Sequence, residues 1–345
     1  MADAGNSSSL HSLGQKARRD LEQARAKIAA LIKAKPSEIV FTGSATESNN
    51  TVLFGLARRH LIISGIEHAS ISEPARALEK RGVKITQISP DKNGLIDPKK
   101  IESSIDSETD LVSIIHGSNE IGTIQDIDRI AKICKKKGVL FHTDAVASFA
   151  RMPIDVKNIS LLTASSHKIG GPMGIAMLYV KEGIKLAPMI YGGGQENGLR
   201  SGTVNVLGAV EFSKHCVLKD YSKIVKLRDY LIDKVLEIEG AHLTGHKTKR
   251  LSYHASFWFN NVEGDALVLE LDKYGVLTST GSACASFSFR PSPALLAIGL
   301  DSRKAGGSLR VSLGEETTFK DIDYFLKILS KIILDKGVGS KLSLA

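Results

Sequence analysis

Lys168 and Asp144 are the two residues whose types and positions most clearly indicate chemistry. Lys168 follows the apolar segment 161–166 and leads into an Ile-Gly-Gly-Pro turn, and Asp144 closes the apolar segment 139–144. Side chains at the ends of two buried strands can face each other across a cleft. This pair suits a lysine that forms a Schiff base with pyridoxal phosphate while an aspartate holds the pyridinium nitrogen. The alternative for Lys168 is a solvated lysine that closes a strand.

Four more polar residues lie at or just beyond the ends of predicted strands. His68 comes after segment 62–66, where a planar ring could stack on the pyridine and relay protons, although a single histidine there can also be structural. Asn119, in Gly-Ser-Asn-Glu-Ile-Gly, could bond the ring hydroxyl or the substrate. Ser165 and His167 flank Lys168 closely enough to reach a phosphate on the same cofactor.

Two further segments could bind an anion. Residues 42–48 read Thr-Gly-Ser-Ala-Thr-Glu-Ser and open a predicted helix, whose free N–H groups and positive dipole end suit a phosphate. The same pattern also serves as an ordinary helix N-cap. Residues 192–203 contain three consecutive glycines followed by Arg200, Ser201 and Thr203, which are good anion ligands, although a surface loop is the alternative.

One cysteine and one arginine near the C-terminus complete the set. Cys284 lies among the small residues 278–286, where a thiol can reach into a site and attack, whereas Cys134 and Cys216 have the larger apolar neighbours typical of packing. Arg310 lies in the predicted strand 309–313 and could clamp a substrate carboxylate with two parallel hydrogen bonds.

The elements that position these residues indicate an α/β protein. A long helix is predicted over 12–35, and strands are predicted over residues 38–42, 60–65, 84–89, 110–116, 139–144, 161–166 and 175–180. Helices between most of these strands imply a mostly parallel sheet covered on both faces, with ligands beyond its carboxyl edge. The last strand follows a short glycine turn, so it should run antiparallel.

The C-terminal part has a different order of predicted helices and strands. Helices near 221–238, 266–274 and 319–334 and strands near 255–261 and 309–313 predict a smaller α+β domain. We therefore expect a large domain over residues 1–225 and a small domain over residues 226–345.

Composition excludes several classes of protein. The 345 residues are 42% hydrophobic, and Lys+Arg minus Asp+Glu is 46 − 37 = +9. The basic residues are spread out without interleaved aromatics, so we expect no direct nucleic-acid binding. Three dispersed cysteines form neither a disulfide framework nor a metal cluster. No apolar run has membrane-spanning length and the N-terminus has no signal-peptide core, so we expect no membrane partner and a cytoplasmic location.

Taken together, these segments resemble the cysteine desulfurases of the NifS/IscS type, within the class V, fold type I aminotransferase superfamily of pyridoxal phosphate enzymes. The resemblance runs from residue 5 to about residue 325. Its most specific pieces are Ala-Thr-Glu-Ser at 45–48, Asn-Glu-Ile-Gly at 119–122, Ser-His-Lys at 166–168, residues 192–203, Gly-Ser-Ala-Cys at 281–284 and Arg-Val-Ser-Leu-Gly at 310–314.

The resemblance implies a role for each residue. Lys168 would carry the cofactor, Asp144 would pair with its ring nitrogen, and Cys284 would accept the sulfur of L-cysteine as a persulfide while alanine leaves. The other implied contacts are His68 stacking on the ring, Asn119 touching cofactor and substrate, Arg310 holding the substrate carboxylate, and Ala45, Thr46, Ser165, His167 and a neighbouring subunit's Thr203 binding the phosphate.

The chain departs from the family pattern at four places. It starts just beyond the usual Tyr-x-Asp-x-x-Ala-Thr-Thr-Pro-like segment, and the stretch between Pro153 and Lys168 is about two residues short. Ala147 replaces a glutamine and Asn197 replaces an arginine. If nothing replaces the glutamine, a bond to the cofactor's ring oxygen is lost, at a cost of about 1–3 kcal/mol.

The resemblance implies a homodimer that passes sulfur to an acceptor or iron–sulfur scaffold protein, for clusters or for thiolation of tRNA or cofactors. Two alternatives remain open on the sequence. One is a related lyase or aminotransferase with the same cofactor, which would not need Cys284. The other is a degenerate, non-catalytic sulfur-carrier scaffold.

Overall fold

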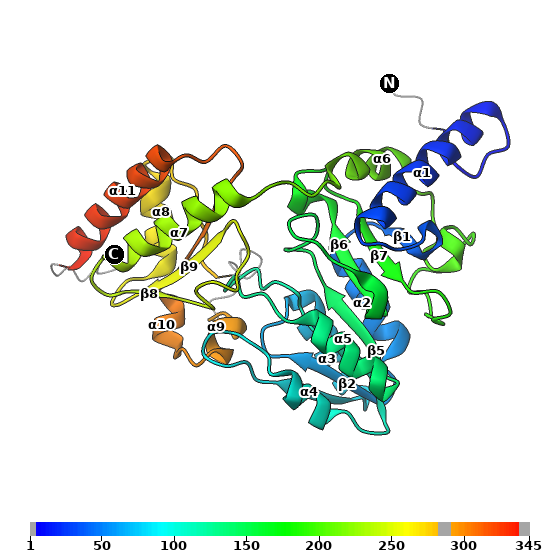
Figure 1. The fold of residues 1–345 in the computed structure, drawn as a ribbon, viewed down its shortest axis with the longest axis horizontal. Helices are drawn as coiled ribbons and strands as arrows, with labels where there is room; N and C mark the ends of the chain where they lie inside the picture. Colours follow the sequence, from blue (N-terminus) through cyan, green and yellow to red (C-terminus); the bar gives the residue numbers. More distant parts are fainter. Residues whose placement is uncertain (1–4, 282–290, 338–345) are drawn as a thin grey trace, which may run out of the picture. The chain divides into compact units, whose positions relative to one another are not determined.

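The computed structural model describes residues 5–281 and 291–337, and side chains as far as residue 334. The chain divides into two compact units (Figure 1). The first comprises Met1–Ile88, Ile96–Gly117 and Gln125–Lys219, and the second comprises Ser89–Leu95, Ser118–Ile124 and Asp220–Ala345. The division after residue 219 falls a few residues before the predicted boundary at 225, and two short loops of the N-terminal part group with the second unit.

The first unit is built on a seven-stranded sheet in the order β1-β7-β6-β5-β4-β2-β3. The neighbouring pairs β2–β3, β2–β4, β4–β5 and β5–β6 are parallel, while β7 runs antiparallel to both β1 and β6. The predicted mostly parallel α/β sheet and its one antiparallel strand are confirmed. The strands are β1 (Ile39–Thr42), β2 (His60–Ser64), β3 (Lys84–Ile88), β4 (Thr109–Ser113), β5 (Leu140–Asp144), β6 (Leu161–Ser165) and β7 (Ala176–Val180).

Helices cover both faces of this sheet because successive strand residues point to opposite sides. Val40 packs in the apolar cluster that contains α2 and α3 side chains, whereas Ile39 and Phe41 pack in the cluster that contains α1, α5 and α6 side chains. The helices are α1 (Ser12–Leu31), α2 (Ala45–Leu56), α3 (Ala69–Glu79), α4 (Pro98–Ser104), α5 (Ile127–Lys137) and α6 (Val206–His215).

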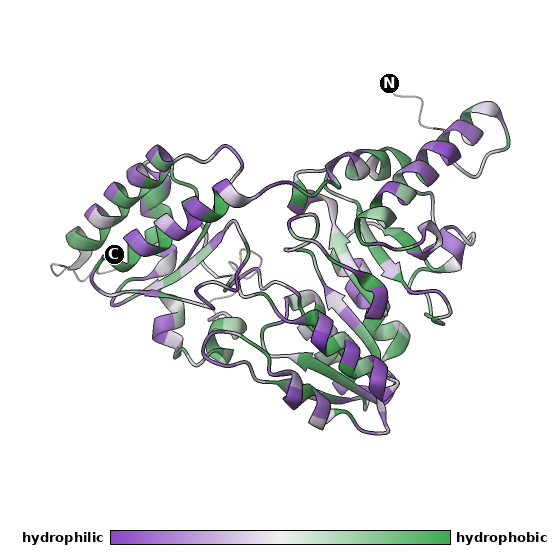
Figure 2. Ribbon diagram, in the orientation of Figure 1, coloured by the Kyte–Doolittle hydropathy of each residue, from purple (hydrophilic) through white to green (hydrophobic). Residues whose placement is uncertain are grey.

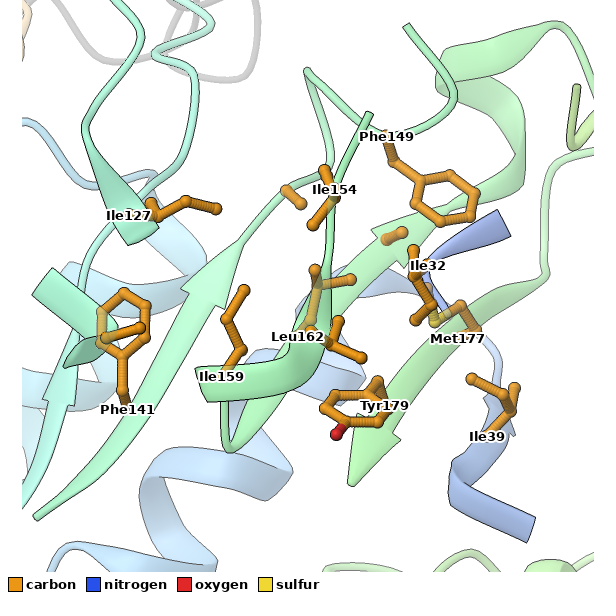
Figure 3. Close-up of a cluster of buried hydrophobic side chains, with 14 of the residues drawn as sticks. Ile32, Ile39, Ile127, Phe141, Phe149, Ile154, Ile159, Leu162, Met177 and Tyr179 are labelled. Carbon is orange, nitrogen blue, oxygen red and sulfur yellow. The ribbon is translucent and has the colours of Figure 1, made fainter. Parts of the chain in front are cut away.

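The larger of these clusters is drawn in Figure 3. Phe141, Leu162 and Tyr179 from three strands lie with Ile32 and Phe149, and all five are at most 2% exposed. Figure 2 shows the corresponding distribution of hydropathy on the ribbon: β2 has hydrophobic colours, and α1 and α5 have many hydrophilic ones. This buried core fixes the strands, and therefore the edge from which the polar strand-end residues project.

The second unit is a smaller α+β unit around an antiparallel sheet in the order β10-β9-β8. Phe257 of β9, Leu309 of β10, and Leu231 of α7 are fully buried in its own apolar cluster. Its elements are α7 (Ser222–Leu236), β8 (Ala241–Leu243), β9 (His254–Phe259), α8 (Gly264–Asp272), α9 (Pro293–Ala297), α10 (Ser302–Gly306), β10 (Ser308–Ser312) and α11 (Phe319–Gly337).

Within the described part of the chain, none of the helices is both long and apolar enough to traverse a bilayer.

Candidate active site

Lys168 and Asp144 come from neighbouring parallel strands. Asp144 is the last residue of β5 and pairs in register with Thr163 of β6. Lys168 lies in the short 3-10 helix Ser166–Ile169 that follows β6. Because the carboxyl ends of parallel strands share one edge of the sheet, the structure brings both residues to that edge.

The two side chains have opposite surroundings. Asp144 is 4% exposed, and its Oδ1 accepts a hydrogen bond from the backbone N–H of Val146 at 2.9 Å. Its Oδ2 accepts one from Nδ2 of Asn49 at 2.8 Å. Lys168 is exposed, and its amine makes no hydrogen bond or ion pair with any residue that the structure describes, although Arg151 donates to its backbone carbonyl at 2.8 Å. The site thus combines an oriented carboxylate and an available amine.

His68 is the N-cap of α3. Its Nδ1 accepts a hydrogen bond from the backbone N–H of Ser70 at 3.1 Å and lies 2.8 Å from the Ser70 hydroxyl. That hydroxyl is 2.8 Å from Nδ2 of Asn49, the same nitrogen that bonds Asp144. A continuous chain of hydrogen bonds therefore joins Asp144 to His68.

The first turn of α2 offers the predicted anion-binding groups. Ser44 caps this helix by accepting from the N–H of Glu47 at 3.1 Å. The N–H groups of Ala45 and Thr46 belong to the first helical turn, where no carbonyl within the helix can accept them. Both residues are at least partly exposed, so a ligand can reach these donors.

Ser165 and His167 interact with each other beside Lys168. The Ser165 hydroxyl lies 2.8 Å from Nδ1 of His167. Partial burial, helped by the nearby charge of Lys168, lowers the pKa of His167. His167 therefore stays neutral near pH 7 and offers the free nitrogen of its ring to a ligand.

Thr203 lies on the segment 192–203, which two ion pairs hold in place. Nη1 and Nη2 of Arg25 each donate to the buried carboxylate of Glu196 at 2.8 Å, and Nε of Arg200 donates to Glu47 at 2.9 Å. Thr203 and Arg200 line a small cavity of about 80 Å³ with Thr42 and Gly43, just before α2. Within one chain, Thr203 is therefore near the predicted phosphate turn.

The second unit brings Asn119 and Arg310 together. Nη1 of Arg310 donates to the backbone carbonyls of Asn119 and Gly281, each at 3.0 Å. Arg310 also forms an isolated antiparallel bridge with Ser279. These contacts fix the backbone on which the cysteine segment begins, while Cys284 itself lies outside the described residues.

Comparison with known proteins shows which family this arrangement represents. The class V aminotransferase family model matches residues 2–325. The chain belongs to the class V aminotransferase family. A cysteine desulfurase IscS from Archaeoglobus fulgidus is 44% identical over 95% of this chain and 90% of its own length, and one from Dictyoglomus turgidum is 42% identical over 95% and 87%. The solved structure of a NifS-like protein superimposes with a TM-score of 0.90 at 34% identity, covering 97% of this chain and 93% of that one.

These relatives place the chain among the cysteine desulfurases of the class V family, as the sequence motifs predict. The two positions where this chain has a different residue from the family pattern, 147 and 197, are buried or have a constrained backbone. Ala147 is 6% exposed, just beyond β5. Asn197 has a φ of 57°, a left-handed conformation that asparagine tolerates better than arginine does.

Three residues of this class V site were not found from the sequence. They are Asn49 and Ser70 of the hydrogen-bond chain, and Glu67, which precedes His68. Asn49 carries a signal, because it lies three and four residues before the buried Val52 and Leu53 and so faces the core. An amide on an apolar helix face needs polar partners, and here these lie at the sheet edge.

Glu67 is 8% exposed, and its Oε1 accepts hydrogen bonds from the Ser64 hydroxyl and from the backbone N–H of Ile115 at 2.9 Å. Burial raises the pKa of Glu67 to about 8, and the negative charge of Asp144 contributes in the same direction. Near neutral pH this carboxyl is therefore mostly protonated.

Proposed function

We propose that this protein is a cysteine desulfurase that uses pyridoxal phosphate to convert L-cysteine to L-alanine and leaves the sulfur on Cys284 as a persulfide. The observation that carries the proposal is that the exposed amine of Lys168, which makes no hydrogen bond or ion pair with a described residue, lies on the same sheet edge as the buried Asp144 carboxylate. Identity of 44% to a cysteine desulfurase over nearly the whole chain supports the substrate and the reaction.

The residues present fit the cofactor. When bound, pyridoxal phosphate supplies an electron sink that weakens bonds at the α-carbon of an amino acid and, next to it, the carbon–sulfur bond of cysteine. Lys168 would hold the cofactor covalently, and Asp144 would accept a hydrogen bond from its protonated ring nitrogen. His68 would lie against its ring.

The phosphate would lie at the start of α2. Its donors would be the N–H groups of Ala45 and Thr46 and the Thr46 hydroxyl, and the helix dipole favours a dianion at this position. Ser165 at the end of β6 and His167 just after it form one hydrogen-bonded pair, which would donate one hydrogen to the phosphate, and Thr203, of this or a second subunit, would complete the set. Hydroxyl, imidazole and backbone donors together suit phosphate oxygens.

Substrate binding would use the second unit. Arg310 carries a forked guanidinium whose geometry matches a carboxylate, and its Nη1 donates to the backbone carbonyls of Asn119 and Gly281. Its guanidinium would hold the carboxylate of cysteine, and Asn119 would contact the bound substrate. The Lys168 amine, when free, would be the base that takes the α-proton of the substrate.

Sulfur transfer would use Cys284. Its thiolate attacks the sulfur of the bound cysteine, so that one S–S bond forms while the substrate's C–S bond breaks. The electron pair of the broken bond remains on carbon, which is then protonated and leaves as alanine. The oxidation of sulfur to a persulfide is balanced by the reduction of the cysteine carbon skeleton to alanine.

We propose further that the protein acts as a homodimer in the cytoplasm, where Cys284 stays reduced, and that a sulfur-carrier or iron–sulfur scaffold protein accepts the sulfur. The dimer would complete the phosphate site with a second copy of Thr203. A sulfur-accepting partner is needed because the persulfide must be cleared before the next turnover.

The test is to incubate the purified protein, reconstituted with pyridoxal phosphate, with L-cysteine, and to measure alanine and protein persulfide together. We expect one persulfide on Cys284, lost in Cys284→Ala and kept in Cys134→Ala and Cys216→Ala, because those two thiols are buried and burial raises the pKa of each to about 12. Cofactor binding without alanine would instead indicate a related lyase or aminotransferase. Failure to bind the cofactor would indicate a sulfur-carrier scaffold.

A further inference from the structure

The hydrogen-bond chain between Asp144 and His68 allows a single consistent assignment of donors and acceptors. Asn49 is fully buried and Ser70 is 6% exposed, so bulk water does not compete for these groups. The two hydrogens on Nδ2 of Asn49 have two acceptors, Oδ2 of Asp144 and Oγ of Ser70, each at 2.8 Å. Because an amide nitrogen accepts no hydrogen bond, Ser70 must be the acceptor in its contact with Asn49.

The amide of Asn49 can lie only one way round. If its oxygen and nitrogen were exchanged, Oδ1 would face the Asp144 carboxylate at 2.8 Å with no hydrogen between two acceptors. In the present orientation Oδ1 has no hydrogen-bond partner among the described residues, which costs free energy. The cost of leaving Oδ1 without a described partner is smaller than the cost of losing the hydrogen bond from Nδ2 to the Asp144 carboxylate.

The Ser70 hydroxyl then has its own hydrogen left to donate. Nδ1 of His68 lies 2.8 Å away and also receives the Ser70 backbone N–H at 3.1 Å. Two donors converge on Nδ1, so this nitrogen presents its lone pair. The hydrogen of the neutral ring must therefore be on Nε2, which makes no hydrogen bond to any described residue.

We propose that Asn49 and Ser70 are positioning residues that hold His68 as the neutral tautomer protonated at Nε2, through a hydrogen-bond chain in which Asn49 donates to both Asp144 and Ser70 and Ser70 donates to His68. The chain also connects Asp144, which would bind the ring nitrogen of the cofactor, to His68, which would lie against the face of the same ring. His68 then presents a hydrogen-bond donor, and not a base, to whatever lies at the sheet edge. That last consequence rests on the proposed function, whereas the tautomer itself does not.

The test is nuclear magnetic resonance of the full chain labelled with ¹⁵N only in histidine, recorded with and without bound pyridoxal phosphate. Two-bond ¹H–¹⁵N correlations distinguish the two neutral tautomers and the cation, and the spectrum of His68→Gln assigns the signals of His68. For wild type we expect the tautomer protonated at Nε2. A wild-type ring protonated at Nδ1, or at both nitrogens, would overturn the proposal.

Two variants test the chain itself. In Asn49→Leu the Ser70 oxygen loses the hydrogen that it accepts, so the hydroxyl can turn its lone pairs to Nδ1 and part of the population should shift toward Nδ1–H. Ser70→Ala removes the hydroxyl but keeps the backbone N–H that donates to Nδ1, so it should shift the population in the same direction by a smaller amount, and it decides the question if the leucine variant does not fold. The matched control is Asn50→Leu, because Asn50 donates to the Thr46 carbonyl and is outside the chain.

If both folded variants keep the wild-type tautomer, Asn49 and Ser70 do not set it and the proposal fails. A protein that binds no cofactor but shows the expected tautomers would refute the proposed function and leave this inference standing.

Discussion

Replacing Glu67 by glutamine should make the first unit less sensitive to pH. Glu67 has a pKa of about 8 in the folded protein, chiefly because it is buried, against 4.5 for an ordinary glutamate. Between these values the folded state binds more protons than the unfolded state. Stability from this group is therefore fully present at low pH and is lost as the pH rises toward 8.

The size of the effect follows from the two pKa values. A difference of one pKa unit corresponds to about 1.4 kcal/mol, so raising the pH from 5 to 8 should remove about 3–4 kcal/mol from the free energy of unfolding. Glutamine has the shape of the protonated acid and keeps an acceptor for the Ser64 hydroxyl and the Ile115 N–H. The substitution should therefore abolish this loss, whatever constant cost the new amide brings.

The assay is urea unfolding of the wild-type, Glu67→Gln and Glu79→Gln proteins at pH 5 and pH 8, all without cofactor. Pulse-labelling hydrogen exchange of peptides from β2 and β4 reports the first unit separately from the second. Glu79 is the control because it is exposed on α3. If wild type and Glu67→Gln lose the same free energy between the two pH values, Glu67 is not protonated in the folded state and our reasoning is wrong.

Three further substitutions should separate stability from function. Asp144→Asn removes the charge that would face the pyridinium, so alanine formation should fall by roughly 100-fold or more in steady-state assays, with weaker cofactor retention in dialysis. Glu196→Gln leaves the buried guanidinium of Arg25 without its anion and should lower the free energy of unfolding by about 3–5 kcal/mol in urea, a loss that an unchanged midpoint would contradict. Arg310→Lys loses the forked geometry for a carboxylate, and we expect the KM for cysteine to rise about 10–100-fold with a smaller change in kcat.

Much of the first unit could be predicted because its strands are short apolar runs separated by helical patterns. The direction of β7 followed from the length of the turn before it, which is too short for a crossover. The strand β8 was missed because its three residues are half-buried or exposed and show no alternation of apolar residues. The segment 12–35 ends as a helix at Leu31, and Lys33 has a φ of 60°, which stops the helix.

The assignment of Asn119 to the second unit depends on distant contacts that no local pattern reveals. Nη2 of Arg250 donates to the carbonyl of Ile121 at 2.9 Å, and Nε2 of His254 contacts the carbonyl of Asn119 at 3.1 Å. Burial, with the nearby positive charges of Arg250 and Arg310, lowers the pKa of His254 to about 3, so its ring is neutral. More than 100 residues separate these partners along the chain. Sequence order alone therefore predicted that Asn119 belongs to the large domain, with the residues next to it in the chain.

The candidate site was predictable where a residue sits at a strand end and not where tertiary contacts define it. Asp144 and Lys168 could be placed because Asp144 ends one apolar strand and Lys168 follows closely on the neighbouring one. Ser70 and Glu67 look ordinary in the sequence. Their importance comes from Asn49 and Ile115, which approach them only in the folded chain.

The most direct test of the central claim is to reduce the cofactor-loaded protein with borohydride and to locate the modified residue by peptide mass spectrometry. We predict a pyridoxyl phosphate group on Lys168, and none there in Lys168→Ala or in wild type treated with L-cysteine before reduction. A protein that carries no such group on Lys168, or carries it on another lysine, would contradict the account.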